Sequence, residues 1–272
     1  MALARVGEIE LDYERSGSGP PLLAIMGMSG TSLHWGEPFL APLREHFEVI
    51  VYDHRGVGAS SRLDGTPLST AQMAEDAAAL LDALELDSAH VLGISMGGMV
   101  AQELALAHPK RIRTLTLGCT YCGGKGSALA APEVLQRLSE AMMSGDRALA
   151  LRVSWEINVS AEMAGEENAY ARFLAIGAQR AVALPVIMAQ MQACAAHDTN
   201  ARLAQLKMPT LVIHGAADQL LPVQNGRLIA SRIPGSQLEI LDRIGHMFFW
   251  ERPERSVELI QAHAACLPTP AP

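Results

Sequence analysis

Val91-Leu92-Gly93-Ile94-Ser95-Met96-Gly97-Gly98 places a serine between two glycines, directly after an apolar run and directly before an alanine-rich helical pattern. This order predicts a sharp turn from a strand into a helix, with Ser95 at the turn. Glycine at positions 93 and 97 removes the side chains that would collide in such a turn. The helix would point its free N–H groups and the positive end of its dipole at whatever Ser95 attacks. The stretch therefore predicts a nucleophilic serine; the alternative role of a serine here is to cap the helix.

Size, composition and charge limit the class of protein. The chain has 272 residues, of which 49% are apolar and 18% charged, which fits one large globular domain with or without an inserted subdomain. A net charge of −8 and the lack of basic runs argue against nucleic-acid binding. No stretch approaches the roughly 18 apolar residues of a membrane span, and the amino terminus lacks the apolar core of a signal peptide. We therefore expect a cytoplasmic protein that binds no membrane.

Four cysteines, at positions 119, 122, 194 and 266, suggest no disulfide framework in a chain of this length. Cys119 and Cys122 have the C-x-x-C spacing of redox and zinc sites. Because no second cysteine pair and no His-x-x-x-His accompanies them, we expect ordinary thiols in a reducing compartment. We expect neither a metal nor a cofactor.

Apolar runs that alternate with helical patterns indicate the fold class. The amino-terminal alternation turns at Gly7 and predicts an antiparallel strand pair. Runs rich in apolar and β-branched residues predict further strands over residues 22–26, 47–52, 89–94, 112–117, 210–214 and 237–241. Helical patterns lie between them: one begins at a capping box, Ser69 to Gln72, and another runs from Met96 to His108. A last helix is expected to bury Val257, Ile260, Ala264 and Leu267. The pattern predicts an α/β fold with a mostly parallel, doubly wound sheet.

One segment interrupts this alternation. Between about Thr120 and Ala204 the sequence shows helical patterns rich in alanine and methionine, and no convincing strand. We interpret the segment as a helical cap inserted over the carboxyl edge of the sheet, where open α/β sheets bind ligands. The expected division is a core of residues 1–119 and 205–272, with a cap of residues 120–204.

A serine hydroxyl is a weak nucleophile at neutral pH, so Ser95 needs a base, and the base needs an acid that orients it. Asp218 and His246 each follow a predicted strand, at its carboxyl end. All three groups would therefore emerge at the same edge of the sheet. Asp242, directly before the histidine loop, and Asp198, in the insertion, are alternative acids.

Five motifs in one order resemble the α/β-hydrolase superfamily over essentially the whole chain. They are Met26-Gly27-Met28-Ser29-Gly30, similar to the oxyanion loop; Asp53-His54-Arg55-Gly56-Val57-Gly58-Ala59-Ser60, similar to D-x-R-G-x-G-x-S; the elbow Gly93 to Gly97; Gly215 to Pro222, similar to G-x-x-D-x-x-x-P; and Gly245-His246 with Glu251-x-Pro253. The resemblance implies that Ser95 attacks a carbonyl carbon, that His246 moves the proton and that Asp218 orients the imidazole. It also implies that the backbone N–H groups of Met28 and Met96 bind the oxyanion.

Two details of these motifs carry expectations of their own. Many family members have His-Gly where this chain has Met26-Gly27, so the oxyanion loop is expected to be held differently here. Asp53 and Arg55 are expected to be structural, satisfying buried backbone groups and each other.

The nucleophile limits the chemistry that the resemblance implies. Relatives that open epoxides or displace halide carry aspartate in the elbow, and the motifs most resemble small serine esterases, enol-lactonases and cofactor-free haloperoxidases. We therefore expect a serine hydrolase that cleaves a carboxylic ester or lactone of small to medium, mainly apolar character through an acyl-enzyme. One alternative is carbon–carbon hydrolysis of a vinylogous diketone, which Met247 after the histidine disfavours weakly. Others are haloperoxidase or perhydrolase activity of the same triad, and a non-catalytic ligand-binding protein.

Several apolar and aromatic side chains near the expected site are candidates for substrate contact, with core packing as the alternative role of each. They are His34, Trp35, Met142, Trp155, Ile187, Met188 and Met191. Methionine adapts its shape to irregular apolar ligands. For assembly, the sequence leaves open a monomer or a small homo-oligomer.

Overall fold

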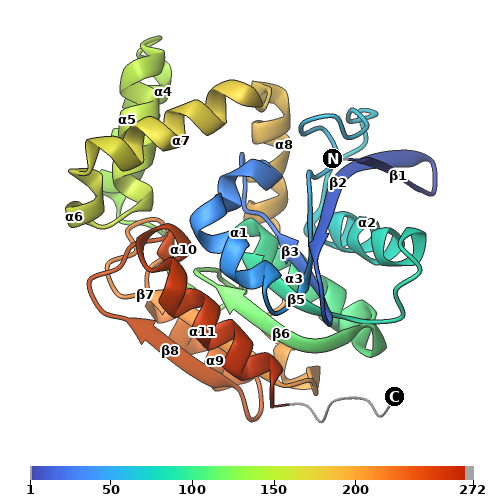
Figure 1. Cartoon of the computed structure of the whole chain (residues 1–272). Coiled ribbons are helices and arrows are strands. Elements are labelled where there is room, and N and C mark those ends of the chain that lie inside the picture. Colours follow the sequence, from blue (N-terminus) through green and yellow to red (C-terminus); the bar gives the residue numbers. More distant parts are fainter. Residues whose placement is uncertain (1, 267–272) are drawn as a thin grey trace.

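A computed structural model of the chain describes residues 2–266 and contains one eight-stranded sheet. The strands lie in the order β1 (Ala2–Val6), β2 (Ile9–Gly17), β4 (Glu48–Tyr52), β3 (Pro21–Ile25), β5 (Ala89–Ile94), β6 (Ile112–Gly118), β7 (Thr210–Gly215) and β8 (Gln237–Leu241). Only the pairs β1–β2 and β2–β4 are antiparallel, and every other neighbouring pair is parallel. The predicted hairpin turns at Gly7, whose φ of 63° suits glycine. The mostly parallel α/β class is confirmed (Figure 1).

Both faces of the sheet are covered, as its sequence predicts. Along β3 the side chains of Leu23 and Ile25 belong to one apolar cluster, and those of Leu22 and Ala24 belong to another. The first cluster includes residues of α2 (Thr70–Ala83), α3 (Met96–Ala107) and α9 (Gln224–Arg232). The second includes residues of α1 (Glu37–Arg44), α10 (Phe248–Glu251) and α11 (Pro253–Ala264). Because successive side chains of a strand point to opposite faces, the sheet is doubly wound.

Local sequence explains where the flanking helices begin and end. The side chain of Ser69 accepts a hydrogen bond from the Gln72 N–H, so the predicted start of α2 is confirmed. The helix predicted to end at His108 ends at Ala107, and a short 3₁₀ turn, η2 (Pro109–Arg111), follows it. Two further 3₁₀ turns are η1 (Ser32–Trp35) and η3 (Leu203–Gln205). Leu267, predicted to lie on the last helix, falls outside the described residues.

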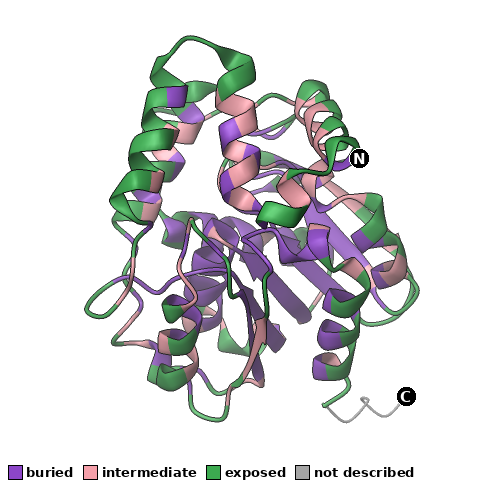
Figure 2. Cartoon of the chain, turned by 90° about the vertical axis from the view of Figure 1, so that its left-hand side faces the viewer, coloured by how far each residue is buried: buried purple, intermediate pink, exposed green. Residues whose placement is uncertain are grey.

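Helices fill the chain between β6 and β7. They are α4 (Pro132–Met143), α5 (Arg147–Asn158), α6 (Ala161–Ala164), α7 (Glu167–Gln179) and α8 (Leu184–Ala195). Figure 1 shows α4–α7 standing apart from the body that holds the sheet, with α8 leading back to it. The central strands β3 to β7 are buried along almost all of their length, and Figure 2 shows the surrounding helices exposed on their outer sides. Among residues 2–266, no single helix is long and apolar enough to cross a membrane; α7 and α8 reach the required length and hydropathy only as a pair, bent by 108°.

The turn after β4 corrects one expectation. Asp53 and Arg55 do not pair with each other. The Arg55 guanidinium binds the carboxylate of Asp76 on α2, with Nε 2.6 Å from Oδ2. Asp53 accepts a hydrogen bond from the Ser32 N–H at 2.6 Å and binds Arg180 at 2.8 Å. The two side chains leave the turn in different directions, so each one meets a partner from a distant part of the chain.

Candidate active site

Ser95 occupies a strained turn between β5 and α3. Its φ of 55° and ψ of −124° lie outside the regions that L-residues ordinarily adopt. A Cβ added to Gly93 would lie 2.3 Å from the Gly97 carbonyl oxygen, and a Cβ added to Gly97 would lie 2.0 Å from the Ile25 carbonyl oxygen. Both positions therefore require glycine, for the reason that the sequence suggests.

The surroundings of Ser95 leave its hydroxyl group free for chemistry. The Ser95 N–H donates to the Gly118 carbonyl at 2.9 Å, and the Thr120 hydroxyl donates to the Ser95 carbonyl at 2.7 Å. These bonds hold the backbone, whereas the Ser95 side chain makes no capping hydrogen bond to α3. The hydroxyl therefore does not cap the helix, and it remains partly accessible because the residue is half-buried.

Asp218 and His246 form a buried hydrogen-bonded pair. Oδ2 of Asp218 lies 2.7 Å from Nδ1 of His246. The other carboxylate oxygen accepts the N–H groups of Leu220 and Leu221, each at 2.9 Å. A carboxylate partner places the hydrogen on Nδ1 of the ring, which leaves Nε2 free to act as a base. Asp242 is an exposed neighbour of Arg243, and Asp198 binds the N–H of Asn200, so neither alternative acid has the contact that Asp218 has.

The environment of Asp218 favours its ionised form. Burial by itself would raise the pKa of this carboxyl. The charge of His246 and the hydrogen bonds from His214 and His246 outweigh burial, and the net effect lowers the pKa of Asp218 below its usual range. Asp218 is therefore a carboxylate throughout the neutral range, as an orienting acid must be.

Three neighbouring residues outside the expected triad hold the acid and histidine loops. Nε2 of His214 donates to the Leu221 carbonyl at 2.7 Å and lies 3.4 Å from the Asp218 carboxylate. Sγ of Cys119 accepts the Gly215 N–H at 3.4 Å and lies 3.8 Å from the Gly245 carbonyl, so it touches both loops. The Glu251 carboxylate accepts the Gly245 N–H at 2.8 Å and the Ser160 N–H at 3.0 Å. The sequence places Glu251 in the histidine-loop motif. For Cys119 and His214 the sequence signal is their place after β6 and within β7.

Cys119, Asp218 and His246 are also close enough for metal binding to be considered. Their possible ligand atoms all lie within 4.8 Å of one another. However, burial and then the Asp218 charge raise the pKa of the Cys119 thiol well above its ordinary value, so the sulfur keeps its proton. Asp218 and His246 already bind each other. This donor set fits a hydrogen-bonded pair with a supporting thiol, and it does not fit a metal centre.

The loop after β3 leaves the N–H group of Met28 without an acceptor among the described residues. The Ser29 N–H donates to Oε1 of Gln190 at 2.9 Å, and the Gly30 N–H donates to the Gly27 carbonyl at 3.3 Å. Within residues 2–266, the N–H of Met28 has no hydrogen-bond partner. Met96 is the first residue of α3, where an N–H has no intrahelical acceptor. These are the two N–H groups that the resemblance implies for the oxyanion.

A histidine from a different element supports this loop. Nε2 of His54, in the turn after β4, lies 3.0 Å from the Met26 carbonyl and must donate to it. Burial lowers the pKa of His54, so the ring is neutral. A Cβ on Gly27 would approach the Ser95 Oγ to 3.6 Å, which shows how closely the loop borders the nucleophile. Many family members have a histidine in the oxyanion loop. Here His54, in the turn after β4, supplies an imidazole that supports this loop.

The candidate substrate residues divide into packed and exposed groups. Trp35 is buried and stacks on Phe39 with 5.5 Å between ring centroids, and Trp155 is buried against Trp250. The backbone oxygen of His34 accepts the Trp250 indole N–H at 2.7 Å. Met142, Met188 and Met191 are exposed, and Ile187 is half-buried. Trp35 and Trp155 have a packing role that explains their burial, His34 is half-buried beside them, and the exposed methionines lie outside the core.

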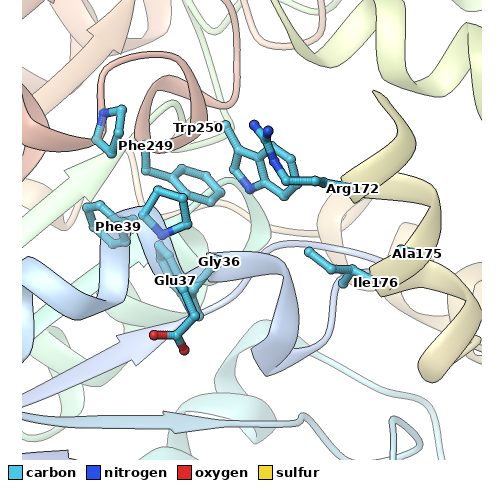
Figure 3. Close-up of a pocket in the computed structure, with 11 residues that line it drawn as sticks. Gly36, Glu37, Phe39, Arg172, Ala175, Ile176, Phe249 and Trp250 are labelled. Atoms are coloured by element: carbon cyan, nitrogen blue, oxygen red, sulfur yellow. The ribbon is translucent and has the colours of Figure 1, made fainter. Parts of the chain in front are cut away.

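A cavity of about 380 Å³ lies away from the candidate chemistry. Figure 3 shows Arg172, Ala175 and Ile176 of α7 on one side, facing aromatic rings that include those of Phe39 and Phe249. The remaining lining residues are Trp35, Gly36, Glu37, Pro38, Trp250 and Pro253. Because this lining includes none of Ser95, Asp218 and His246, its volume does not measure the space for a substrate.

Comparisons with known proteins place the chain among hydrolases. A provisionally named carbamate hydrolase, RutD, of Azorhizobium caulinodans is 31% identical over 96% of this chain and 97% of its own length. The pimeloyl-[acyl-carrier protein] methyl ester esterase of Aeromonas hydrophila is 29% identical over 93% of this chain and 98% of its own length. Among solved structures, the enol-lactonase of Burkholderia xenovorans LB400 superposes with a TM-score of 0.82 at 26% identity, over 97% of this chain and all of that one (100%).

The family assignment rests on most of the sequence. The profile of the alpha/beta hydrolase fold matches residues 20–174 and 187–253, which include the elbow, the acid loop and the histidine. These matched segments also contain β3 to β8, the strands that carry the candidate site at their carboxyl ends. The chain belongs to the α/β-hydrolase fold family.

Proposed function

We propose that this protein is a serine hydrolase that cleaves a carboxylic ester or a lactone through an acyl-enzyme intermediate. The observation that carries the proposal is the strained Ser95 turn, with a free hydroxyl, at the same edge of the sheet as the buried Asp218–His246 pair. Relatives named as an ester esterase and an enol-lactonase support the same class of bond.

The proposed reaction uses the groups in the order of their chemistry. Nε2 of His246 removes the Ser95 proton while Oγ attacks the substrate carbonyl carbon. The negative oxygen that forms accepts hydrogen bonds from the N–H groups of Met28 and Met96. His246 then returns the proton to the leaving alkoxide, and the carbon–oxygen bond breaks to give an acyl-Ser95 and an alcohol. Water, deprotonated by His246, attacks the acyl carbon. The bond between that carbon and Ser95 Oγ then breaks, His246 returns the proton to Oγ, and the carboxylic acid is released. In a lactone the alcohol stays attached to the acyl chain.

The proposal also assigns residues 120–204 to a cap that contacts a small-molecule substrate. Exposed methionines on α4 and α8 support this role, because a methionine without core contacts is available to an apolar ligand. We keep the cytoplasmic location as part of the proposal; free thiols at all four cysteines are in accord with a reducing compartment.

The primary test is covalent labelling of Ser95 by an alkyl fluorophosphonate, with mass spectrometry of the labelled peptide. We expect labelling of Ser95 in the folded protein and none after heat denaturation. Ser95→Ala should also abolish turnover of p-nitrophenyl acetate and butyrate while the protein stays folded. A folded protein that is not labelled at Ser95 would contradict the proposal.

A substrate panel separates the proposed bond from the alternatives. It contains p-nitrophenyl esters, γ- and δ-lactones, an aryl carbamate and a vinylogous diketone. Haloperoxidase activity is measured separately, as the bromination of monochlorodimedone in the presence of acetate and peroxide. We expect the highest kcat/KM among the esters and lactones. A higher value for the diketone or the carbamate would replace the proposed bond while retaining the Ser95 nucleophile.

A further inference from the structure

Gln190, on α8, is a fully buried polar side chain with a hydrogen bond at only one end of its amide, among the described residues. Its Oε1 accepts the Ser29 N–H at 2.9 Å. This bond fixes the amide orientation, because an N–H donor must face the oxygen. Its Nε2 has no partner among the described residues. Buried amides are ordinarily satisfied at both ends, so a half-satisfied one indicates a constraint other than stability.

The bond to Ser29 decides which backbone N–H of the oxyanion loop is free. Ser29 has a φ of 58°, a left-handed backbone conformation that residues other than glycine rarely adopt. With the Ser29 N–H donated to Gln190 and the Gly30 N–H donated to Gly27, Met28 is the residue of the three whose N–H remains available. If Gln190 were absent, the Ser29 N–H would lose its acceptor, and the loop could turn a different N–H toward the nucleophile.

The helix that carries Gln190 is attached firmly to the core at its next turn. The Tyr121 hydroxyl donates to the Cys194 carbonyl at 2.5 Å. Ala193 is buried in the same apolar cluster as α2 and α3. A side chain one turn before these anchors is well placed to hold a loop still.

We propose that Gln190 is a positioning residue that sets the oxyanion loop through Ser29 and so keeps the Met28 N–H available to the substrate oxygen. This inference rests on the proposed hydrolase function. In this proposal Gln190, which lies in the helical segment 161 positions from Ser29, helps to position the N–H group that stabilises the transition state. Contacts made in the transition state and not in the ground state change kcat and leave KM nearly unchanged.

The test compares Gln190→Met with Gln192→Met. Methionine has a similar length and shape and removes both amide groups, and Gln192 is an exposed residue two positions away on the same helix. Removal of an oxyanion donor costs about 100- to 1000-fold in rate, and a displaced donor costs less. We expect Gln190→Met to lower kcat for p-nitrophenyl butyrate by about 10- to 100-fold, with KM within about twofold of wild type. Gln192→Met should match wild type.

Two further measurements keep the inference testable. Gln190→Asn keeps the amide but is one methylene too short to reach Ser29, and we expect it to lose kcat as well. The rate of fluorophosphonate labelling, whose phosphoryl oxygen needs the same donors, should fall in parallel in both Gln190 variants. Unchanged kcat and labelling rates in folded Gln190→Met and Gln190→Asn would overturn the inference. A wild-type protein that is not labelled would instead refute the proposed function, so the two failures are distinguishable.

Discussion

Replacing Ser95 by glycine should stabilise the protein while destroying its activity. Ser95 has a φ of 55° and a ψ of −124°, a conformation that is sparsely populated for any residue with a side chain. The fold enforces it, because the Ser95 carbonyl accepts from Gly98, Met99 and Thr120 and its N–H donates to Gly118. Glycine keeps all of these backbone bonds and removes the Cβ that makes the conformation costly.

The size of the effect follows from two opposing contributions. A residue held in such a conformation costs about 1–3 kcal/mol. Glycine loses more backbone entropy on folding than alanine, by about 0.5–1 kcal/mol. Ser95→Gly should therefore be more stable than Ser95→Ala by about 1–2 kcal/mol. For a chain of this size, the difference corresponds to a rise in Tm of about 2–8 °C.

The assay is a pairwise comparison of these two variants by thermal and urea unfolding, with ester turnover measured on the same samples. Neither variant has a hydroxyl at position 95, so both should be inactive. The two variants should differ in the backbone strain at position 95. Equal unfolding free energies, or a less stable Ser95→Gly, would refute the argument that the elbow stores strain.

Three further changes have expected outcomes of their own. Asp218→Asn should lower kcat by about 10⁴-fold, because an amide cannot hold the His246 tautomer. Asp242→Asn, at an exposed position, should not change kcat. A larger loss of kcat in Asp242→Asn than in Asp218→Asn would show that Asp242 is the acid. Burial lowers the pKa of His197 from 6.5 to about 4, so the folded state resists a proton that the unfolded state accepts. This residue's contribution to stability should be complete above pH 6.5 and fall by up to about 3 kcal/mol toward pH 4, and His197→Asn should remove that contribution from the pH dependence of the free energy of urea unfolding. Gly177→Ala in α7 should stabilise by about 1 kcal/mol, because no atom lies within 4 Å of the added Cβ; an unchanged Tm would contradict this.

The fold was predictable because its signals are local. Apolar runs of strand length and helical stripes between them identify parallel strands buried on both faces, and the faces of β3 show this alternation. The need for glycine at positions 93 and 97 also follows from neighbours along the chain and across one strand pair. Chain order and strand ends are sufficient to bring Asp218 and His246 to one edge.

The side-chain partners at the site were not predictable in the same way. The expected Asp53–Arg55 pair was inferred from two positions close in sequence, and both residues instead bind partners from distant elements. Nothing local indicates that His54 supports the Met26 carbonyl or that Cys119 touches both the acid loop and the histidine loop. These contacts depend on how loops that are distant in the sequence pack together, and local patterns in a single sequence do not predict that packing.

The helical segment between β6 and β7 is attached to the loops of the candidate site by three buried or partly buried polar bonds. These are Gln190 to Ser29 at 2.9 Å, Arg180 to Asp53 at 2.8 Å and Glu251 to Ser160 at 3.0 Å. Glu251 binds the Gly245 N–H as well, so the segment reaches the residue next to His246 through one carboxylate. Hydrogen-bonded groups of this kind hold a fixed geometry more strictly than apolar contacts do, because their energy depends on angle as well as distance. Changes in this segment that break one of these bonds should therefore alter the catalytic rate and not substrate preference alone, and a variant selected for a new substrate should retain these three bonds if its kcat is retained.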